Sequence, residues 1–259
     1  MIGCIVQARM GSSRLPGKTL MKVDDKNTVL DFIINQLSYS KLIDKLILAT
    51  TNLSMDDIIE DSIKDLDVKL FRGNTNDVLD RYYQCAKKFS LNIIVRITAD
   101  NPLIDPFIID EMISKFCLKN YDYMTNTIPR TFPYGTEVEI LTFNALEKAW
   151  YNAKKPSERE HVTPYFYNNP KNFKIHQVQF SSNLSNLRWT IDKQSDLDLV
   201  KSIVSKVIKR PILLDDIIML YNNEPKIFEI NKTHIPNEGY LKSLKEDNIF
   251  EKNEKNNEK

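Results

Sequence analysis

A loop rich in small and positively charged residues follows the first apolar segment of the chain. It reads QARMGSSRLPGK from residue 7 to residue 18 and includes Gln7, Ala8, Arg9, Gly11, Ser12, Ser13, Arg14 and Lys18. Small residues let successive backbone N–H groups approach an anion, and the cations add charge and donors, so the loop is suited to holding a triphosphate. It does not match the Walker A pattern, because Gly11 and Gly17 lie six positions apart. Judged from Gly11 and its neighbours alone, the segment could equally well be an ordinary surface loop with exposed cations.

Two aspartates, Asp100 and Asp192, come directly after strand-like runs that lie far apart in the sequence. A carboxylate at the carboxyl end of a strand faces the ligand crevice of an α/β sheet and is a natural oxygen ligand for Mg²⁺. Two of them would hold one or two cations against phosphate groups, as nucleotidyl transfer requires. Judged from the neighbouring residues alone, Asp100 could equally well cap the turn that follows it.

Three further polar clusters lie elsewhere in the sequence, at residues 71–81, 130–139 and 158–165. They contribute Arg72, Gly73, Asp77, Arg81, Arg130, Glu137, Glu139, Glu160 and His161 to the candidate site. Two of these clusters, at residues 71–81 and 158–165, also have a structural explanation. Asp77 and Arg81 have the spacing of a helical ion pair, and a solvated helix start explains His161 as well as substrate binding does.

The elements that must position these residues alternate between strand and helix. Strand-like runs at residues 2–6, 45–50, 68–71 and 92–97 alternate with helical patterns at residues 28–37, 55–66, 77–89 and 106–118. Such alternation predicts βαβ units and a Rossmann-like, mostly parallel sheet with helices on both faces. Ligands of such α/β folds bind at the carboxyl ends of the strands.

The second half of the chain has a different pattern. Residues 121–191 mix strand-like runs at 138–141 and 173–180 with helical patterns at 143–153 and 161–168, which predicts a small mixed α/β lobe capping the sheet edge. Further helices are predicted at residues 196–208 and 215–221. Residues 1–250 are expected to form one domain, and residues 251–259, which contain no apolar residue, a disordered tail.

The composition limits the possible classes of protein. A chain of 259 residues with 42% hydrophobic residues can bury a substantial core. Its net charge of +1 gives no general attraction to nucleic acid or to a membrane surface. The three cysteines show no spacing typical of a zinc site or a disulfide framework. No targeting or membrane-spanning segment is recognisable, so we expect a cytoplasmic protein.

The loop at residues 7–18 closely resembles the N-terminal signature of the sugar cytidylyltransferases, the family that contains CMP-ulosonate and CMP-acylneuraminate synthetases. The spore-coat polysaccharide biosynthesis branch is the most similar, and the likeness covers roughly residues 1–200. The resemblance implies a nucleotide-diphospho-sugar transferase type of fold and a homodimer. It implies that Asp100 and Asp192 bind metal, with Ala99 replacing the glycine usual in the branch. It also assigns nucleotide binding to Arg72, Gly73, Asp77, Arg81 and Thr98, and substrate binding to Arg130, Glu137, Glu139, Glu160 and His161.

The implied reaction transfers CMP from CTP to a sugar acid or sugar phosphate and releases pyrophosphate, with Mg²⁺ as cofactor. Arg14, Lys18, Asp100 and Asp192 are its expected catalytic residues. A GTP-dependent guanylyltransferase is an alternative. A glycosyltransferase is another, since the string DLD matches its D-x-D pattern, although Ser195 or Asp196 is better explained as a helix N-cap. A non-catalytic nucleotide-binding module would tolerate loss of both metal carboxylates.

Overall fold

Four parallel strands form the centre of the sheet in this computed structural model, which describes residues 1–232 and 238–257. They are β1 (Ile2–Gln7), β2 (Lys45–Thr51), β3 (Lys69–Gly73) and β4 (Ile93–Thr98). β1 pairs in parallel with both β2 and β4, and β2 pairs with β3. Their mostly buried apolar side chains are typical of strands that are covered on both faces.

Three shorter strands extend the same sheet beyond β4, so the region predicted as a mixed lobe continues the sheet. They are β5 (Tyr123–Thr125), β6 (Glu139–Thr142) and β7 (Ile175–Gln177). The order across the described part of the sheet is β3-β2-β1-β4-β6-β5-β7, with β6 antiparallel to its two neighbours. The mostly parallel α/β fold is therefore confirmed. The strand expected at residues 173–180 is shorter than predicted.

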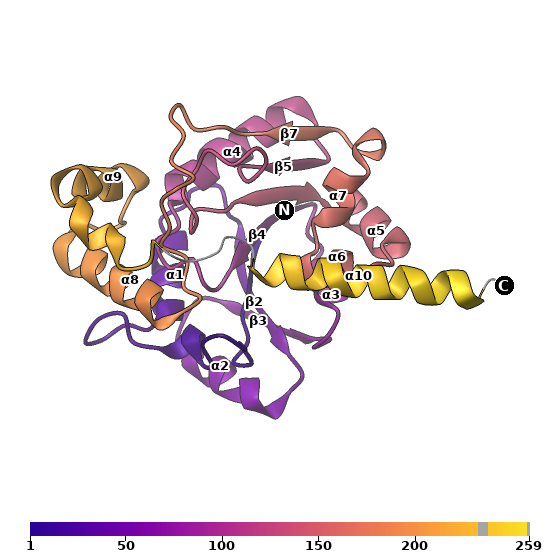
Figure 1. Ribbon diagram of the computed structural model, residues 1–259, viewed down its shortest axis with the longest axis horizontal. Helices are drawn as coiled ribbons and strands as arrows, with labels where there is room; N and C mark the ends of the chain where they lie inside the picture. Colours follow the sequence, from indigo (N-terminus) through magenta and orange to yellow (C-terminus); the bar gives the residue numbers. More distant parts are fainter. Residues whose placement is uncertain (233–237, 258–259) are drawn as a thin grey trace.

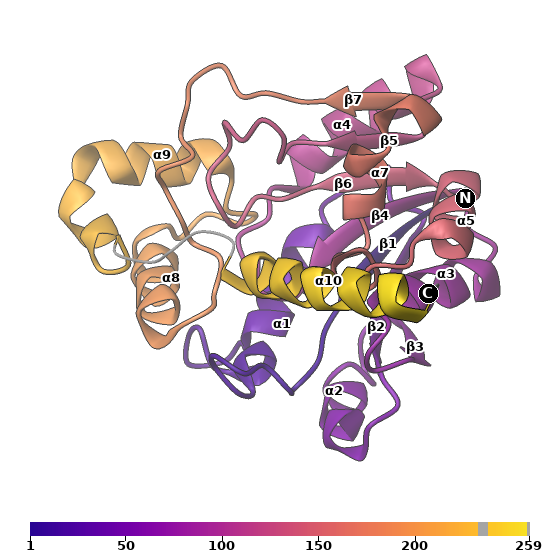
Figure 2. The same cartoon turned by 45° about the vertical axis from the view of Figure 1, so that its right-hand side comes forward.

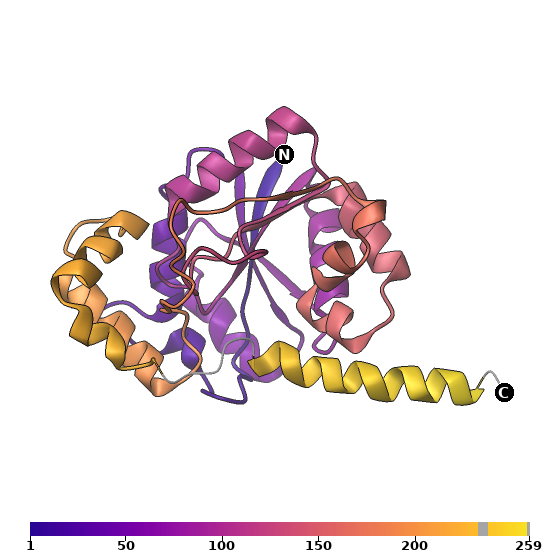
Figure 3. The same cartoon turned by 45° about the horizontal axis from the view of Figure 1, so that its top comes forward.

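Helices cover both faces of the sheet (Figures 1, 2 and 3). They are α1 (Val29–Leu37), α2 (Asp57–Ser62), α3 (Val78–Lys88), α4 (Pro106–Lys119), α5 (Phe143–Asn152), α6 (Pro156–His161), α7 (Pro164–Asn168), α8 (Gln194–Lys206) and α9 (Leu214–Asn223). Apolar residues of α1, α4 and α8 form one core, whereas those of α3 and α5 form a second core on the opposite face. The helix expected at 161–168 is divided between α6 and α7.

Local sequence explains where the helices of the first half begin. Thr28 caps α1 and exchanges hydrogen bonds with Asp31, which completes a capping box. Asp77 accepts a hydrogen bond from the backbone N–H of Asp80 at the start of α3. Asp105 does the same for α4, whose first residue is a proline. These caps set the lengths of the loops that follow the strands.

The C-terminal segment differs from the sequence prediction. A long helix, α10 (Glu238–Asn257), includes residues 251–257, which were expected to be disordered. A polar contact explains the difference, because Lys155, which directly precedes α6, forms an ion pair with Glu251 of α10 at 2.6 Å. The remaining residues of the predicted tail, 258 and 259, lie outside the described residues. Among the described helices, none has the length and apolar character required to cross a membrane.

Candidate active site

Lys18 lies between the two predicted metal ligands. Its Nζ donates to Oδ2 of Asp100 at 3.0 Å, to Oδ1 of Asp192 at 3.0 Å and to the carbonyl of Ile191 at 2.5 Å. Arg14 also contacts Oδ1 of Asp192. The structure therefore brings all four expected catalytic residues into one cluster, although two of them lie in the N-terminal loop and Asp192 is more than 170 residues away.

The charges of this cluster stabilise one another. Burial alone would raise the pKa of Asp192, but Lys18 and Arg14 outweigh it and hold the pKa well below its usual range. Burial would likewise lower the pKa of Lys18, whereas Asp100 and Asp192 outweigh it and raise the pKa. At neutral pH Lys18 is therefore cationic and Asp192 anionic.

Asp100 and Asp192 reach the cluster from different kinds of segment. Asp100 follows β4, as predicted, and its carbonyl accepts a hydrogen bond from Ile191 N–H at 2.8 Å. Asp192, however, does not end a strand: it lies in a loop that leads into α8. This part of the prediction was wrong: buried Trp189 and Ile191 give the segment a strand-like pattern, but its backbone forms an isolated bridge with Tyr134 and does not extend into a strand.

The residues after Asp192 stabilise the start of α8. Asp196, expected with Ser195 as a candidate N-cap, is the third residue of α8, and its carboxylate accepts from the backbone N–H groups of Asp192 and Lys193. It is fully buried, and Arg188 and Asn231 donate to it. Asp196 therefore fixes the backbone of Asp192. The sequence analysis missed this support, and also missed Arg188, which donates to Asp192 Oδ2 at 2.7 Å.

The N-terminal loop is closed by its own backbone. Gly17 N–H donates to the carbonyl of Met10 at 3.0 Å, and Met10 N–H donates to Asp56 Oδ1 at 2.7 Å. Gly17 has a positive φ of 72°, which places Lys18 at the start of a short 3₁₀ turn. Arg9 remains 44% exposed and lies 3.9 Å from Glu160. The loop thus offers Arg9 to solvent and directs Lys18 toward the carboxylates.

The cluster at residues 71–81 contains two kinds of side chain: those that already have protein partners and one, Arg81, that has unsatisfied nitrogens. Arg72 forms ion pairs with Asp57 and Glu60 and donates to backbone carbonyls, so α2 and the loop before it account for its interactions. Asp77 caps α3 and accepts from Arg159. The possible ion pair between Asp77 and Arg81 is not formed. Instead Arg81 is 1% exposed, and its Nε and Nη1 have no partner among the described residues.

The segment at residues 130–139 contacts the residues before Asp192, because Trp189 N–H donates to the carbonyl of Tyr134 at 2.8 Å. Glu137 accepts hydrogen bonds from Arg130 at 2.7 Å, Asn101 at 2.9 Å and the N–H of Gly135 at 2.9 Å. Asn101 also donates to Thr98. Through Asn101, which the sequence analysis did not select, this predicted substrate-binding segment is connected to the residue after Asp100.

Gly135 is predicted to be essential for this geometry. Its φ is 106°, and a Cβ there would lie 2.7 Å from the backbone nitrogen of Thr190. We expect Gly135→Ala to destabilise the fold by roughly 1 to 3 kcal/mol and to lower turnover, because the backbone that carries Asp192 must shift. Gly11→Ala is a matched control, since its Cβ would find only Met55 sulfur, at 3.9 Å. Thermal unfolding of both variants checks this; equal melting temperatures would contradict it.

Glu139 and His161 lie on the side of the site formed by β6 and α6. Glu139 is buried, pairs with Arg96 of β4 and accepts from Tyr123. Arg96 also donates to Gln7 Oε1 at 3.3 Å. His161 contacts Ser243 of α10 at 3.0 Å, and Ser243 contacts Glu160 at 2.8 Å. Glu139 is therefore enclosed by protein groups, whereas the Glu160 and His161 pair adjoins a helix that the sequence analysis did not predict.

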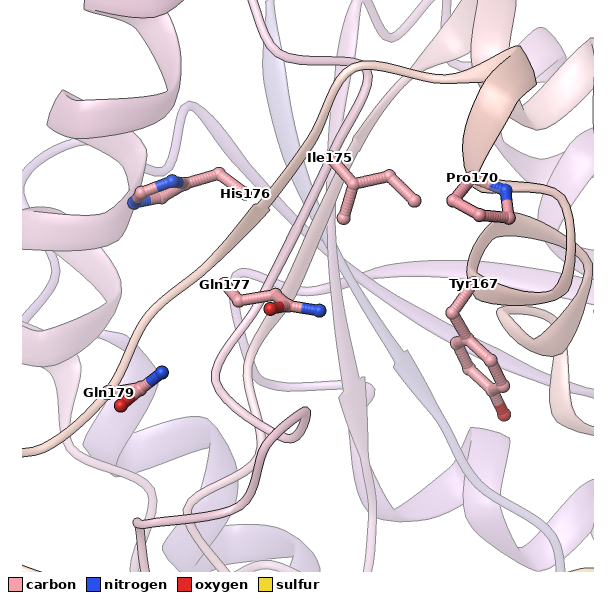
Figure 4. A pocket seen from close by; sticks show the side chains of 6 residues that line it. All are labelled: Tyr167, Pro170, Ile175, His176, Gln177 and Gln179. Atoms are coloured by element: carbon pink, nitrogen blue, oxygen red, sulfur yellow. The ribbon is translucent and has the colours of Figure 1, made fainter.

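A separate pocket lies beside β7, away from the charged cluster. Figure 4 shows its lining, which consists of Tyr167, Pro170, Ile175, His176, Gln177 and Gln179. None of the predicted site residues lines it. His176 stacks on Tyr121 and has no acidic or cysteine partner there. The side chains able to bind a charged ligand are instead those around Lys18.

Comparison with known proteins identifies the family. The cytidylyltransferase family model matches residues 3–255. A cytidylyltransferase structure from Leptospira borgpetersenii serovar Hardjo-bovis has a TM-score of 0.85 and 36% identity, covering 90% of this chain and 98% of that chain. The spore coat polysaccharide biosynthesis protein SpsF of Bacillus subtilis is 32% identical, covering 85% of this chain and 94% of SpsF.

A more distant similarity concerns enzymes with a named sugar-acid substrate. The 3-deoxy-manno-octulosonate cytidylyltransferase of Leptospira interrogans is 32% identical over 111 residues, which is 42% of this chain and 44% of that protein. The matches confirm the resemblance derived from the N-terminal loop. With the fold and the cluster around Lys18, they establish that this chain is a nucleotidyltransferase that belongs to the cytidylyltransferase family.

Proposed function

We propose that the protein transfers CMP from CTP to the hydroxyl of a sugar acid and releases pyrophosphate, in the synthesis of a surface glycan. The observation that carries this proposal is the position of Lys18 between Asp100 and Asp192, beside Arg14. This cluster combines cations for phosphates with carboxylates for a metal ion. The octulosonate substrate of one relative and the polysaccharide role of another support the acceptor class and the pathway.

The cations of the N-terminal loop would bind the triphosphate. Arg9 is exposed, whereas Arg14 contacts the carboxylate of Asp192 and Lys18 contacts that of Asp100. Charge-assisted hydrogen bonds to the β- and γ-phosphates would stabilise pyrophosphate as it departs. The acceptor oxygen attacks the α-phosphate in line, so the protein mainly positions the reactants and requires no nucleophile of its own.

Asp100 and Asp192 would hold Mg²⁺. Their carboxylates suit this ion because both already converge on a single cation, the ammonium of Lys18, and because Mg²⁺ prefers oxygen ligands. When bound, the ion would neutralise phosphate charge and polarise the oxygens that react. Arg188 and Asp196 would then keep the Asp192 carboxylate oriented.

Arg81 supports binding of the nucleotide near the loop. A buried guanidinium with two unsatisfied nitrogens is costly unless an acceptor reaches it. Burial lowers the pKa of Arg81, and the neighbouring charge of Arg9 lowers it further. An oxygen of the nucleotide would satisfy these donors. We infer CTP as the nucleotide from the family, with GTP as the alternative that the experiment below includes.

The experiment that tests the function is a matrix of the four nucleoside triphosphates against ulosonic acids and sugar phosphates, read as pyrophosphate release. We expect release with CTP and a sugar acid. Release only with GTP and a sugar phosphate would replace the proposal with guanylyl transfer. No release from any pair, together with turnover of a nucleotide sugar, would favour a glycosyltransferase.

Metal dependence and assembly are tested on the same enzyme. Activity should vanish with EDTA and return with Mg²⁺ or Mn²⁺, because carboxylate oxygens suit both ions. Full activity in EDTA would remove the metal from the proposal.

We also propose that the protein is cytoplasmic and forms a homodimer. Light scattering coupled to size-exclusion chromatography would check the dimer.

A further inference from the structure

Helix α10 packs against α6 (Figure 1). The contacts come from residues four apart, which lie on the same side of a helix. Ser243 bonds to Glu160 and His161, Asp247 accepts from the N–H and hydroxyl of Ser157, and Glu251 pairs with Lys155. This C-terminal helix therefore completes the surroundings of two predicted substrate-binding residues.

The same helix begins beside the catalytic cluster. Its first residue, Glu238, lies 3.6 Å from Lys193, the neighbour of Asp192. A Cβ at Gly239 would lie 3.3 Å from Nη1 of Arg14. One turn later Ser243 reaches Glu160, which in turn faces Arg9 at 3.9 Å. The pair of Glu160 and His161 thus stands between α10 and the cations of the N-terminal loop.

The backbone after His161 is strained. Val162 has φ 71° and ψ −51°, and Thr163 N–H donates to the carbonyl of His161 at 2.8 Å in a tight γ-turn. A β-branched residue rarely adopts this conformation, and such strain persists where the surrounding packing enforces it. Val162 is fully buried, so its packing holds the turn that orients His161.

The hydrogen bonds of Ser243 have a definite direction. A serine hydroxyl has one proton, and an ionised carboxylate can only accept. The 2.8 Å contact with Glu160 therefore takes the hydroxyl proton, in preference to the Gly239 carbonyl at 3.4 Å. At its 3.0 Å contact with His161 Nε2, Ser243 must then accept. His161 carries its proton on Nε2, which leaves Nδ1 as an acceptor when the ring is neutral.

The ring is neutral near pH 7 because of its surroundings. Burial lowers the pKa of His161, and the charge of Glu160 opposes this shift without cancelling it. The other charged groups that act on the ring are Arg96 of β4, Glu139 of β6 and Asp247 of α10. No described residue donates a hydrogen bond to Nδ1, so this atom has an open acceptor position.

We propose that Ser243 is a positioning residue for the acceptor: it fixes His161 as the Nε2–H tautomer, so that Nδ1 accepts a hydrogen bond from a hydroxyl of the sugar acid. The proposal rests on the proposed function for the identity of the bound molecule. It assigns the acceptor side of the site to α6 and α10, which adjoin the cations expected to hold the triphosphate. The tautomer itself is a property of the free protein.

The first test is a long-range ¹H–¹⁵N spectrum of the free, uniformly ¹⁵N-labelled protein at pH 7.5. The chain has three histidines, so replacing the other two assigns the signals of His161. We expect the Nε2–H tautomer in the wild type and a mixture of tautomers in Ser243→Ala. An Nδ1–H tautomer in the wild type, or an unchanged spectrum in the variant, would overturn the proposal. The wild-type spectrum tests the tautomer even if the variant does not fold.

The second test is kinetic. Ser243→Ala should raise the KM for the sugar acid by roughly two- to tenfold, because the hydrogen bond between the sugar acid and His161 Nδ1 is weakened. The KM for CTP should remain unchanged. Ser114→Ala removes a similar helical serine on α4 and should change neither constant. An unchanged acceptor KM would refute the positioning role. If no acceptor is turned over at all, the proposed function fails, while the spectrum still decides the tautomer.

Discussion

Asp192→Asn and Asp100→Asn are each expected to lower kcat by roughly a hundredfold or more at saturating CTP and Mg²⁺. Each change removes one anionic oxygen from the pair that converges on Lys18. The amide that replaces it is a weaker ligand for Mg²⁺ and a weaker partner for the ammonium. Pyrophosphate release measured over a range of Mg²⁺ concentrations checks this result. Wild-type turnover in either variant would exclude that carboxylate from catalysis.

A stability measurement separates this effect from unfolding. The pKa of Asp192 is depressed from 3.8, so its contribution to stability is present above that pH and is lost as the pH falls through the folded value. Asp192→Asn should therefore lower the melting temperature at pH 7, and the difference should shrink in acid. Asp198→Asn is the matched control, because Asp198 is exposed on α8 and pairs only with Gln194 among the described residues. It should retain both activity and stability.

Lys18→Ala and Arg14→Ala are expected to weaken binding of CTP far more than binding of CMP. A charge-assisted hydrogen bond contributes about 1.5 to 3 kcal/mol, so each loss should reduce CTP affinity about ten- to a hundredfold. CMP lacks the β- and γ-phosphates and should bind almost as before. Calorimetric titration of both nucleotides into each variant checks the difference.

The control for this experiment is Lys26→Ala, which removes an exposed lysine close to the same segment. The affinity of the Lys26→Ala variant for CTP should remain at the wild-type value, apart from a small change in general electrostatic attraction. Equal losses of CTP and CMP affinity in Lys18→Ala would mean that Lys18 contacts the α-phosphate. In that case the roles of Lys18 and Arg14 in holding pyrophosphate would have to be reassigned.

The paired charges also define how the free protein differs from the bound one. Without nucleotide, Lys18 and Arg14 neutralise Asp192, and Lys18 neutralises Asp100. Binding CTP together with Mg²⁺ would exchange partners: the cations would take phosphate oxygens, and the carboxylates would take the metal. This exchange leaves no buried charge unpaired, which keeps the cost of desolvation low.

The sequence by itself determined the central sheet, the family and the four residues of the cluster. Short apolar runs alternating with capped helices can form only a few arrangements, and parallel strands bring their carboxyl ends to one edge. The loop at residues 7–18 was recognisable because its residues are contiguous, and Asp100 because it follows a strand directly. Such signals are local, so they survive without knowledge of the fold.

Only the tertiary structure decided how distant segments meet at the site. Asp192 was selected from the sequence and lies in the cluster, but its loop is held by Asp196 and Arg188, each four residues away, and by the turn at Gly135, more than 50 residues away. The partner of Asp77 is Arg159, which is 82 residues away, whereas Arg81, four residues from Asp77, leaves Nε and Nη1 without a partner among the described residues. Hydrogen bonds across such separations depend on packing, which the sequence specifies only through the whole fold.

The C-terminal helix illustrates the same limit most clearly. Residues 251–257 have no apolar side chain, and by composition they have nothing to bury, so the sequence favoured disorder. In the structure Glu251 pairs with Lys155, and the residues after it continue a helix whose earlier turns are held by Ser157 and Glu160 of α6 through Asp247 and Ser243. A helix can extend beyond its docked turns because each added residue gains a backbone hydrogen bond once nucleation has been completed elsewhere.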